Sequence, residues 1–388
     1  MSTGTSQSDY AGGPLRGVRV IDLSRLAPGP YCTMLLADMG AEVIAVSGGR
    51  AGRPVQEFAR GKRFMSLDLK SDAGRLALHK LVSSADVVVE GFRPGVAERM
   101  GAGYASLSEV NPKIVYCSIT GYGQDGPRAH DAGHDINYIA LSGVLSALGV
   151  EGHPPRPPLN LVADFAGGSL VAVVGILAAL LECRTSGRGQ FIDTAMVDGS
   201  LSMMAMHLPV WGSKVWPTQG RHVLDGTMPF YRTYICSDGR FVAVGALEPA
   251  FFAALWKGLA LGAAPEHLRV ANWPRIEAAL TAAFVARPRD DWAELFQGTD
   301  ACVTPVLEPD EVWTDPQISS RHPTSGARSV PAIPRLSRTP AAARVYDDSD
   351  QTATILRELG FDDASIAAAT LPTSGTAPGL EWPPPLVW

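Results

Sequence analysis

Short apolar runs alternate with amphipathic stretches along the first third of the chain. The runs rich in Val and Ile are typical of buried strands, and they occupy residues 17–24, 41–46, 86–92 and 113–121. Residues 29–40 and 72–85 carry apolar positions at helical spacing, and Gly40 is a helix stop signal. This order predicts an α/β fold with a Rossmann-like, doubly wound parallel sheet, whose ligands bind beyond the carboxyl ends of the strands.

The second half of the chain has a different pattern. Two aromatic and β-branched runs within residues 228–245 flank the turn signal Ser237-Asp238-Gly239, which predicts a β-hairpin, and a mostly helical segment follows it. Stretches rich in Pro with Gly and Trp, or with Ser and Arg, predict linkers. The predicted segments are a disordered tail (1–13), a large domain (14–204), a linker (205–227), a smaller α+β domain (228–320), a second linker (321–342) and a C-terminal segment (343–388).

One carboxylate, Asp164, precedes seventeen uncharged residues, 165–181. A helix of that length spans about 26 Å at about 1.5 Å per residue, short of the roughly 30 Å of a bilayer core. Gly167, Gly168 and Gly175 interrupt the run, and no basic residue flanks it directly. We therefore expect a helix buried in a soluble core and no membrane insertion.

The composition narrows the class of protein. A length of 388 residues suggests two domains, and a net charge of −6 argues against a nucleic-acid partner. The scattered cysteines form no C-x-x-C pair, which argues against a disulfide framework and a zinc site and favours a cytoplasmic location. They are Cys32, Cys117, Cys183, Cys236 and Cys302. The polar N-terminus lacks the order of a signal peptide.

The first strand–helix turn carries no dinucleotide fingerprint. It reads SRLAPGPYC, with Pro28 and Pro30 around Gly29 where a G-x-G-x-x-G pattern would be needed. The second strand ends in AVSGGR, without the acidic residue that contacts a ribose. We therefore expect no nicotinamide cofactor.

Polar residues at three predicted helix starts are candidates for chemistry. His134 serves there either as a cap or as an acid–base group. Asp164 fits an N-cap, and the glycines behind it allow a ligand to approach closely. An apolar wall raises its pKa, whereas the helix dipole lowers it. Glu248 precedes Pro249, which by itself is a common helix-start signal.

The stretches AGHDINY (132–138), LNLVADFAGGS (159–169) and GALEP (245–249) occur in this order along the chain. With GPLRGVRVIDLSRLAPGP, VVEGFRPGVAERMG, TGYGQDGPR and DACVTPVL, they resemble the alpha-methylacyl-CoA racemases of the family III CoA-transferase (CaiB/BaiF) fold. The resemblance covers residues 14 to about 310 and is weaker at 352–361.

The resemblance implies an enzyme that interconverts R and S 2-methylacyl-CoA thioesters by 1,1-proton transfer. It implies no metal and no organic cofactor, with coenzyme A as the carrier of the substrate. His134, paired with Asp135 or Glu248, looks like one acid–base group and Asp164 looks like the other, with Asn160 as an orienting group. An enolate intermediate needs hydrogen-bond donors, for which backbone amides near Asp135 or at the glycine-rich helix start are candidates.

The resemblance also implies contacts to the CoA phosphates and backbone. The candidates are the side chains of Arg60, Arg63, Lys70 and Arg93 and the backbone at Leu67 and Leu69. The family commonly has Lys or Arg in the second strand, whereas this chain has Ala45 and Ser47. One contact is then missing, or it is moved to Arg50 or Arg53.

The family fold is an interlocked homodimer, in which each chain has a large Rossmann-like and a small domain joined by two linkers. The resemblance thus implies that residues 343–388 return to the large domain and that Glu248 approaches His134 from the partner chain. A CoA-transferase on the same fold is the alternative function, with Asp164 as a nucleophile that forms an acyl-enzyme anhydride. Transferases of this fold generally lack the histidine of AGHDINY, so His134 favours the racemase.

A more distant alternative is a non-catalytic CoA-binding or scaffold protein, which would not require His134 and Asp164 together. The sequence does not identify the acyl chain of the substrate. A broad, adaptable pocket could be lined by Met203, Met204, Met206 and the residues around Trp211 and Trp216, although such Met-rich stripes more often pack in a core.

Overall fold

The computed structural model describes residues 12–25, 27–47, 55–214, 216–217, 222–323, 329–347 and 349–371. The chain divides into two compact units. Unit 1 comprises residues 1–142, 158–204 and 329–388, and unit 2 comprises 143–157 and 205–328. Arg50, Arg53 and most of the predicted tail lie outside the described residues.

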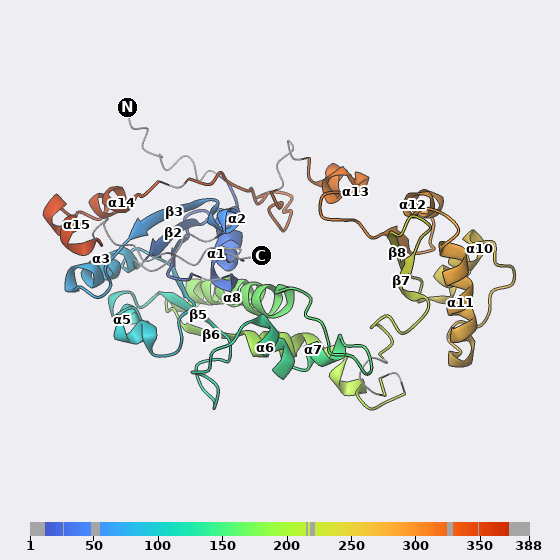
Figure 1. Ribbon diagram of the computed structural model, residues 1–388. Coiled ribbons are helices and arrows are strands. Elements are labelled where there is room, and N and C mark those ends of the chain that lie inside the picture. The colour runs from blue at the N-terminus through green and yellow to red at the C-terminus, as the bar shows by residue number, and fades with distance from the viewer. Residues whose placement is uncertain are drawn as a thin grey trace, which may run out of the picture. The chain divides into compact units, whose positions relative to one another are not determined.

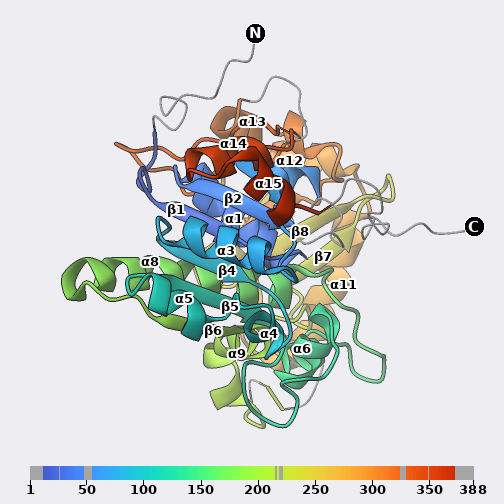
Figure 2. The same cartoon turned by 90° about the vertical axis from the view of Figure 1, so that its left-hand side faces the viewer.

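Unit 1 is built on a six-stranded sheet in which every neighbouring pair is parallel. In spatial order the strands are β3 (Lys62–Ser66), β2 (Glu42–Ser47), β1 (Arg19–Asp22), β4 (Val87–Glu90), β5 (Val115–Thr120) and β6 (Phe191–Ala195) (Figure 2). The strand order reverses between β1 and β4, which is where open α/β sheets form a ligand crevice. The predicted parallel sheet is confirmed.

Helices cover the sheet of unit 1 (Figure 1). They are α1 (Pro28–Asp38), α2 (Gln56–Ala59), α3 (Asp72–Val82), α4 (Val96–Arg99), α5 (Tyr104–Val110), α6 (Asp135–Leu141), the π-helix η2 (Leu161–Leu170), α8 (Val171–Ser186), α9 (Met196–Ser202), the 3-10 turn η3 (Met203–Met206), α14 (Thr352–Glu358) and α15 (Asp363–Ala369). The Ser71 side chain accepts a hydrogen bond from Gly74 N and so caps α3.

The end of the described chain packs into the core of unit 1. Ile355 and Leu356 of α14 and Ile366 of α15 belong to the same buried cluster as Leu78 of α3 and Val88 of β4. α15 contacts α3 beside the sheet (Figure 1). Burying each of these aliphatic side chains contributes about 1.5–3 kcal/mol. Residues far apart in the sequence therefore share one core.

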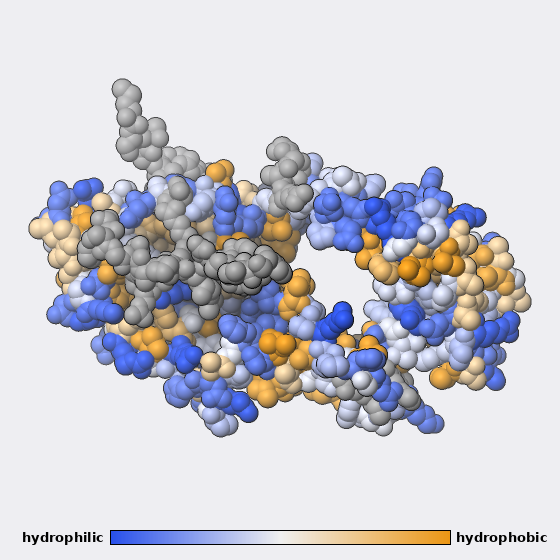
Figure 3. All heavy atoms as spheres, viewed as in Figure 1, coloured by the Kyte–Doolittle hydropathy of each residue, from blue (hydrophilic) through white to orange (hydrophobic). Residues whose placement is uncertain are grey.

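The apolar run after Asp164 forms one continuous helical segment, Leu161–Ser186, which is long and apolar enough by length and composition alone to cross a membrane. α8 packs against β5 and β6. Its residues Val173 and Ile176 are buried, whereas the side chains of Val174 and Leu181 are 67% and 68% exposed. The expected burial in a core thus holds for one face of α8 within this single chain, and the opposite face is open. Apolar side chains reach the surface of unit 1 in the region of α6 and α8 (orange in Figure 3).

Unit 2 contains a three-stranded antiparallel sheet in the order β7 (Tyr231–Ile235), β8 (Phe241–Gly245) and β9 (Val303–Pro305). β7 and β8 form the predicted hairpin, and Gly239 in its turn has φ 78°. The helical elements are α7 (Val144–Ala147), η4 (Leu208–Val210), α10 (Pro249–Gly258), η5 (Val270–Asn272), α11 (Trp273–Phe284), α12 (Arg289–Phe296), η6 (Val312–Thr314) and α13 (Pro316–Arg321). Aromatic side chains including Phe230, Phe252 and Phe284 fill its core.

Candidate active site

His134 is the N-cap residue of α6, and its side chain is exposed. Its backbone N–H donates to Asn137 Oδ1 at 3.0 Å. The Tyr138 hydroxyl donates to the carbonyl oxygen of the preceding residue, Gly133, at 2.6 Å, and the Tyr122 ring packs edge-on against Tyr138 with 5.0 Å between centroids. The backbone at His134 is therefore held from both sides, while the imidazole stays accessible.

Asp164 lies inside η2, so the expectation that it caps the helix is wrong. Asn160 is the N-cap residue, and the backbone turns into the helix at Leu159, which has φ 58°. Asn160 Nδ2 donates to Asp164 Oδ2 at 2.9 Å across one turn. The orienting function that the resemblance implies for Asn160 stays a prediction, and it would act through this contact. Both residues belong to unit 1, as does His134.

The environment of Asp164 raises the pKa of its carboxyl group. Burial is the largest cause, and the nearby Asp135 carboxylate adds to it, whereas the hydrogen bond from Asn160 and the charge of His134 act in the opposite direction. α6, which His134 caps, packs against η2, and the charge of His134 acts on Asp164. A carboxyl group with a raised pKa is protonated more readily near neutral pH, which suits a group that both takes and gives a proton.

Asp135 is buried, and its carboxylate faces η2. Oδ2 accepts hydrogen bonds from Ala163 N at 2.6 Å and from Asp164 N at 2.9 Å. Oδ1 is buried without a hydrogen-bond partner. Among the hydrogen bonds of the described residues, none joins Asp135 to the His134 ring. The Asp135 side chain thus contacts the segment that carries Asp164, and its pairing with His134 stays a prediction.

An aromatic cluster forms the wall behind Asp164. The ring of the next residue, Phe165, packs edge-on against two other aromatic rings. The distance between ring centroids is 5.0 Å to Tyr31 of α1 and 5.8 Å to Phe58 of α2. Glycines let the backbones of η2 and α9 touch: a Cβ atom on Gly199 would lie 2.0 Å from the carbonyl oxygen of Gly167. The sequence predicted both the apolar wall and a close approach at these glycines, but the approaching group is α9.

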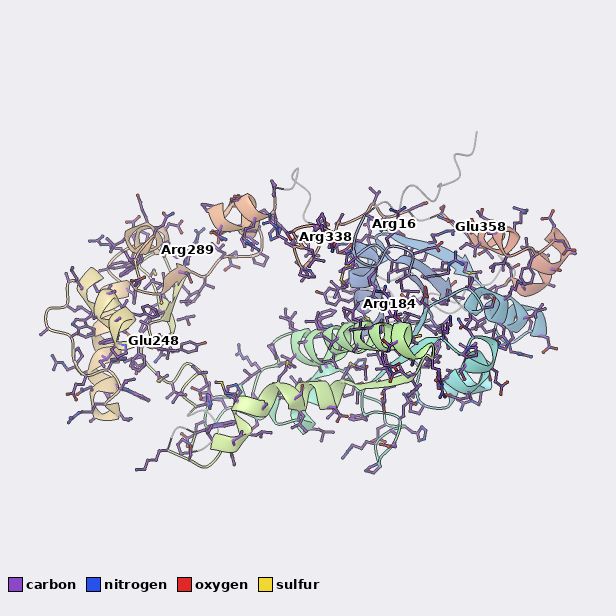
Figure 4. All side chains as sticks on the ribbon, turned by 180° about the vertical axis from the view of Figure 1, so that it is seen from behind. Arg16, Arg184, Glu248, Arg289, Arg338 and Glu358 are labelled. Atoms are coloured by element: carbon purple, nitrogen blue, oxygen red, sulfur yellow. The ribbon has the colours of Figure 1, made fainter. Side chains whose placement is uncertain are left out.

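Two of the predicted CoA contacts have side chains that pair with carboxylates of the same chain. The buried Arg60 guanidinium contacts both oxygens of Asp38, at 3.1 and 2.5 Å, and also pairs with Glu57. It borders a polar cavity of about 330 Å³. Arg63 bridges Glu42 at 2.8 Å and Glu358 of α14 at 2.9 Å (Glu358 is labelled in Figure 4).

Lys62, between these two arginines, is fully buried. Its Nζ atom contacts Asp22 Oδ2 at 3.0 Å, Thr33 Oγ1 at 2.6 Å and the carbonyl oxygen of Pro30 at 2.9 Å. Burial lowers the pKa of Lys62, and the Asp22 carboxylate opposes that effect. This ion pair lies under the turn between β1 and α1 and fixes that turn.

The remaining predicted CoA contacts have different surroundings. Leu67 and Leu69 are buried core residues, and Leu67 N already donates to the carbonyl oxygen of Ser47. Lys70 and Arg93 have exposed side chains. Arg93 lies close enough to Tyr138 for its charge to lower the pKa of that phenol, although burial raises it overall to about 12. Arg93 thus lies within electrostatic reach of Tyr138 in α6.

Glu248 belongs to unit 2, where it is the exposed N-cap residue of α10 (Figure 4). Its carboxylate lies near Cys302 and helps to raise the pKa of that thiol, after burial as the larger cause. Pairing of Glu248 with the His134 of another chain stays a prediction. Within the described residues no group of three or more His, Cys, Asp or Glu side chains is placed to hold a metal ion.

Two residues at the site were not singled out from the sequence. Tyr138 ends the AGHDINY stretch, and the i, i+4 spacing from His134 on a helix indicates that the two are neighbours. Ser169 is fully buried, and its Oγ atom contacts the carbonyl oxygens of Pro28 at 2.7 Å and Asp164 at 3.0 Å. A serine inside an apolar run gives no sequence signal for such a bridge.

Comparison with known proteins gives a consistent set of similarities. Residues 15–346 match the profile of CoA-transferase family III. Two curated relatives, each covering 91% of this chain and covered over 95% of their own length, are named alpha-methylacyl-CoA racemase; the mouse protein is 44% identical and the human protein 40% identical. A crystal structure of a CaiB/BaiF family protein from Brucella suis is 28% identical, with a TM-score of 0.75, and the match covers 90% of this chain and all of that one.

Proposed function

This chain belongs to CoA-transferase family III, and we propose that within the family it is an epimerase that interconverts R and S 2-methylacyl-CoA thioesters. The relatives named alpha-methylacyl-CoA racemase support this substrate class. The observation that carries the proposal is the pair of acid–base groups in unit 1, an accessible His134 near an Asp164 whose pKa is raised. A reaction that moves one proton off a carbon and another onto it needs two such groups.

In the proposed reaction one of the two groups takes the proton from C2 of the acyl chain. The electron pair of the broken C–H bond moves toward the thioester, and an enolate forms. The second group then donates a proton to the opposite face of C2, which restores the thioester with inverted configuration. His134 and Asp164 exchange these functions when the reaction runs in the other direction.

Hydrogen-bond donors are needed where negative charge develops on the thioester oxygen. Of the two sets of backbone amides considered, those of Ala163 and Asp164 at the start of η2 already donate to the Asp135 carboxylate. We therefore assign the enolate oxygen to the amides beside Asp135 at the start of α6. Phe165 and its aromatic neighbours exclude water from the Asp164 side of the site.

For the CoA part of the substrate we propose contacts from the exposed side chains of Lys70 and Arg93. Arg60 and Arg63 serve mainly to support this region, because their guanidinium groups already pair with carboxylates. Opposite charges in close pairs lower the potential that each presents to a phosphate.

The proposed assembly is a homodimer of the interlocked kind. The exposed apolar face of η2 and α8 supports it, since Val174, Leu181 and Leu170 present 67%, 68% and 42% of their surface in the single chain. In this assembly Glu248 of the second copy approaches His134. Val174→Glu is expected to give monomers in analytical ultracentrifugation and to abolish epimerisation; a stable dimer with full activity would refute the assignment of this face.

A CoA-transferase is the second candidate, and the shared family supports it. There Asp164 would attack the acyl carbon and release CoA as a thiolate. Incubation with (2R)-2-methylacyl-CoA in deuterated water separates the two. The epimerase takes up α-deuterium and forms the S epimer. Transfer of CoA to a second carboxylic acid, with an acyl-Asp164 anhydride trapped by hydroxylamine and no deuterium uptake, would establish the transferase instead.

A further inference from the structure

The segment that carries Asp164 is a π-helix of ten residues, Leu161–Leu170. Hydrogen bonds in a π-helix run from i to i+5, and such helices are rare, short and frequently found at functional sites. A register of this kind is less stable than an α-helix unless surrounding contacts hold it. The contacts around η2 should therefore show which residues maintain it.

The first turn of η2 is held from outside by Asp135. The first residues of any helix have backbone N–H groups without partners inside the helix. In η2 the amides of Ala163 and Asp164 donate to Asp135 Oδ2, at 2.6 and 2.9 Å. The carboxylate thus takes the place of an N-cap side chain, which the N-cap residue Asn160 does not supply to the backbone. The negative charge also suits the positive end of the helix dipole.

Two further contacts hold the middle of η2. The Ser169 Oγ atom lies 3.0 Å from the carbonyl oxygen of Asp164, five residues earlier, and 2.7 Å from that of Pro28 at the start of α1. On the other side, Gly167 packs against Gly199 of α9 so closely that a Cβ atom on either has no room. Ser169 thus contacts the carbonyl oxygen of Asp164, whereas Asp135 holds the backbone N–H groups of the turn that contains Asp164.

We propose that Asp135 is a positioning residue for Asp164: its carboxylate caps η2 from α6, holds the π-helical register of the first turn and so keeps the Asp164 carboxyl group beside Asn160 and His134. This assignment rests on the proposed epimerase function, and it differs from a pairing of Asp135 with the His134 ring. One oxygen of Asp135 makes both contacts to η2, and the other is buried without a partner.

The arrangement couples the two candidate acid–base groups through one residue. Asp135 follows His134 directly in α6, and its side chain holds the backbone N–H of Asp164 itself. A shift of α6 thus moves both groups together. The Asp135 charge also raises the pKa of Asp164. The Asp135 side chain therefore affects both the orientation of the Asp164 carboxyl group and its proton affinity.

The test measures α-proton exchange in single-base variants. His134→Ala leaves Asp164 as the base, and Asp164→Ala leaves His134, so each variant reports deuterium uptake at one face of C2. Asp135→Ala and Asp135→Asn are each introduced into both single-base variants. Deuterium uptake into each epimer of a 2-methylacyl-CoA is then followed by mass spectrometry. Asp131→Ala is the matched control, because this exposed aspartate forms a surface ion pair with Arg128, away from η2 in the sequence.

Asp135→Ala is expected to slow Asp164-dependent exchange about 100-fold, the cost of a misplaced reacting group, and to slow His134-dependent exchange far less. Asp135→Asn restores much of the lost rate, because its amide oxygen still accepts from both backbone amides. It also moves the acid limb of Asp164-dependent exchange to lower pH, since a negative charge is lost. Equal slowing in both backgrounds, or slowing of His134-dependent exchange alone, would overturn the assignment.

A readout without substrate separates this inference from the proposed function. Amide hydrogen exchange at Ala163 and Asp164 reports the cap directly. Asp135→Ala is expected to accelerate exchange at these two amides by tenfold or more, about the effect of losing one hydrogen bond worth roughly 1.4 kcal/mol, while Asp135→Asn retains protection. If the wild-type protein epimerises no acyl-CoA but the amides respond in this way, the proposed epimerase function is wrong and the positioning of η2 by Asp135 is still supported. Unchanged protection in Asp135→Ala contradicts the positioning alone.

Discussion

Two groups of charged residues in unit 1 differ in how completely their charges are matched. In the β1–β3 cluster, defined here as Arg60, Lys62 and Arg63 with their partner carboxylates, every basic group lies within 3.1 Å of a carboxylate oxygen. In the α6–η2 site, defined as His134, Asp135, Asn160 and Asp164, the imidazole is exposed and one carboxylate oxygen is buried without a partner. The charges of the first group are matched within the chain, whereas the second group keeps an exposed imidazole and an unpaired carboxylate oxygen.

The comparison separates the density of charge along a sequence from the charge that is not already paired within the chain. The stretch ARGKRF has the composition of a phosphate site, yet its side chains turn back onto carboxylates of the same sheet and its neighbouring helices. A buried ion pair contributes little net stability but costs several kcal/mol when one partner is lost. Charge availability, and not charge density, separates the two groups.

The largest effect is expected from Asp164→Ala and His134→Ala. Each removes one acid–base group, and epimerisation should fall by about 100- to 10,000-fold, the usual contribution of such a group. Chiral chromatography of the acyl-CoA products measures this. Melting temperatures close to that of the wild-type protein are the control for folding. An Asp164→Ala protein that still epimerises would refute the contrast between the two groups.

Lys62→Met is expected to act on stability. It leaves the Asp22 carboxylate buried without its cation, which should lower the free energy of unfolding by about 3–5 kcal/mol. The midpoint of urea unfolding reports the change. Adding Asp22→Asn removes the uncompensated charge and should recover part of the loss. If stability stays unchanged while the KM for acyl-CoA rises, the β1–β3 cluster faces the ligand instead.

Asn160→Ala tests the proton affinity of Asp164. The hydrogen bond from Asn160 stabilises the carboxylate, so its loss raises the pKa of Asp164 further. In the direction where Asp164 is the base, the rate falls as pH drops through that pKa, and the acid limb should move to higher pH. A pH–rate profile measures the limb.

The raised pKa of Asp164 also makes the stability of the protein depend on pH. The folded pKa of Asp164 lies above the unfolded value, so the folded protein binds this proton more tightly, and stability falls as pH rises between the two values. Asn160→Ala should widen that range. A limb that stays in place in this variant would show that the observed pH dependence belongs to another group.

The smallest effect is expected from replacing an exposed arginine, Arg93, compared with replacing a paired one, Arg63. Arg93→Gln should raise the KM for acyl-CoA several-fold with little change in kcat, because it removes binding that is equal in ground and transition states. Arg63→Gln, the matched variant in the β1–β3 cluster, should leave KM unchanged and lower stability by about 1 kcal/mol or less. Steady-state kinetics at two salt concentrations measure both. The reverse pattern would exchange the two assignments.

Local patterns in the sequence predicted much of the fold. The β7–β8 hairpin follows from alternation around the turn that contains Gly239, and the parallel strands follow from runs of Val and Ile. The start of α6 at His134 was likewise predicted. The open face of α8 was not predicted, because residues 171–181 are uncharged on every side of the helix and their periodicity gives no direction.

The site was predicted as a set of residues and not as an arrangement. The stretch around Asp164 indicated the right segment, but the N-cap pattern placed the helix start four residues too late. The π-helical register depends on contacts to α6, α1 and α9, which local sequence does not encode. For the same reason the sequence did not predict that the Asp135 carboxylate accepts hydrogen bonds from the amides of η2. The pairing of His134 with Asp135 or Glu248, which the resemblance implies, stays a prediction.

The return of the chain to unit 1 has a consequence for folding during synthesis. Ile355, Leu356 and Ile366 complete a core that begins with Ile21 and Leu67, and all of unit 2 is made in between. A core with such distant partners closes slowly, because loop closure precedes the contacts that stabilise it. On the ribosome, unit 2 therefore has time to fold first. The core of unit 1 stays incomplete until α14 and α15 have been synthesised.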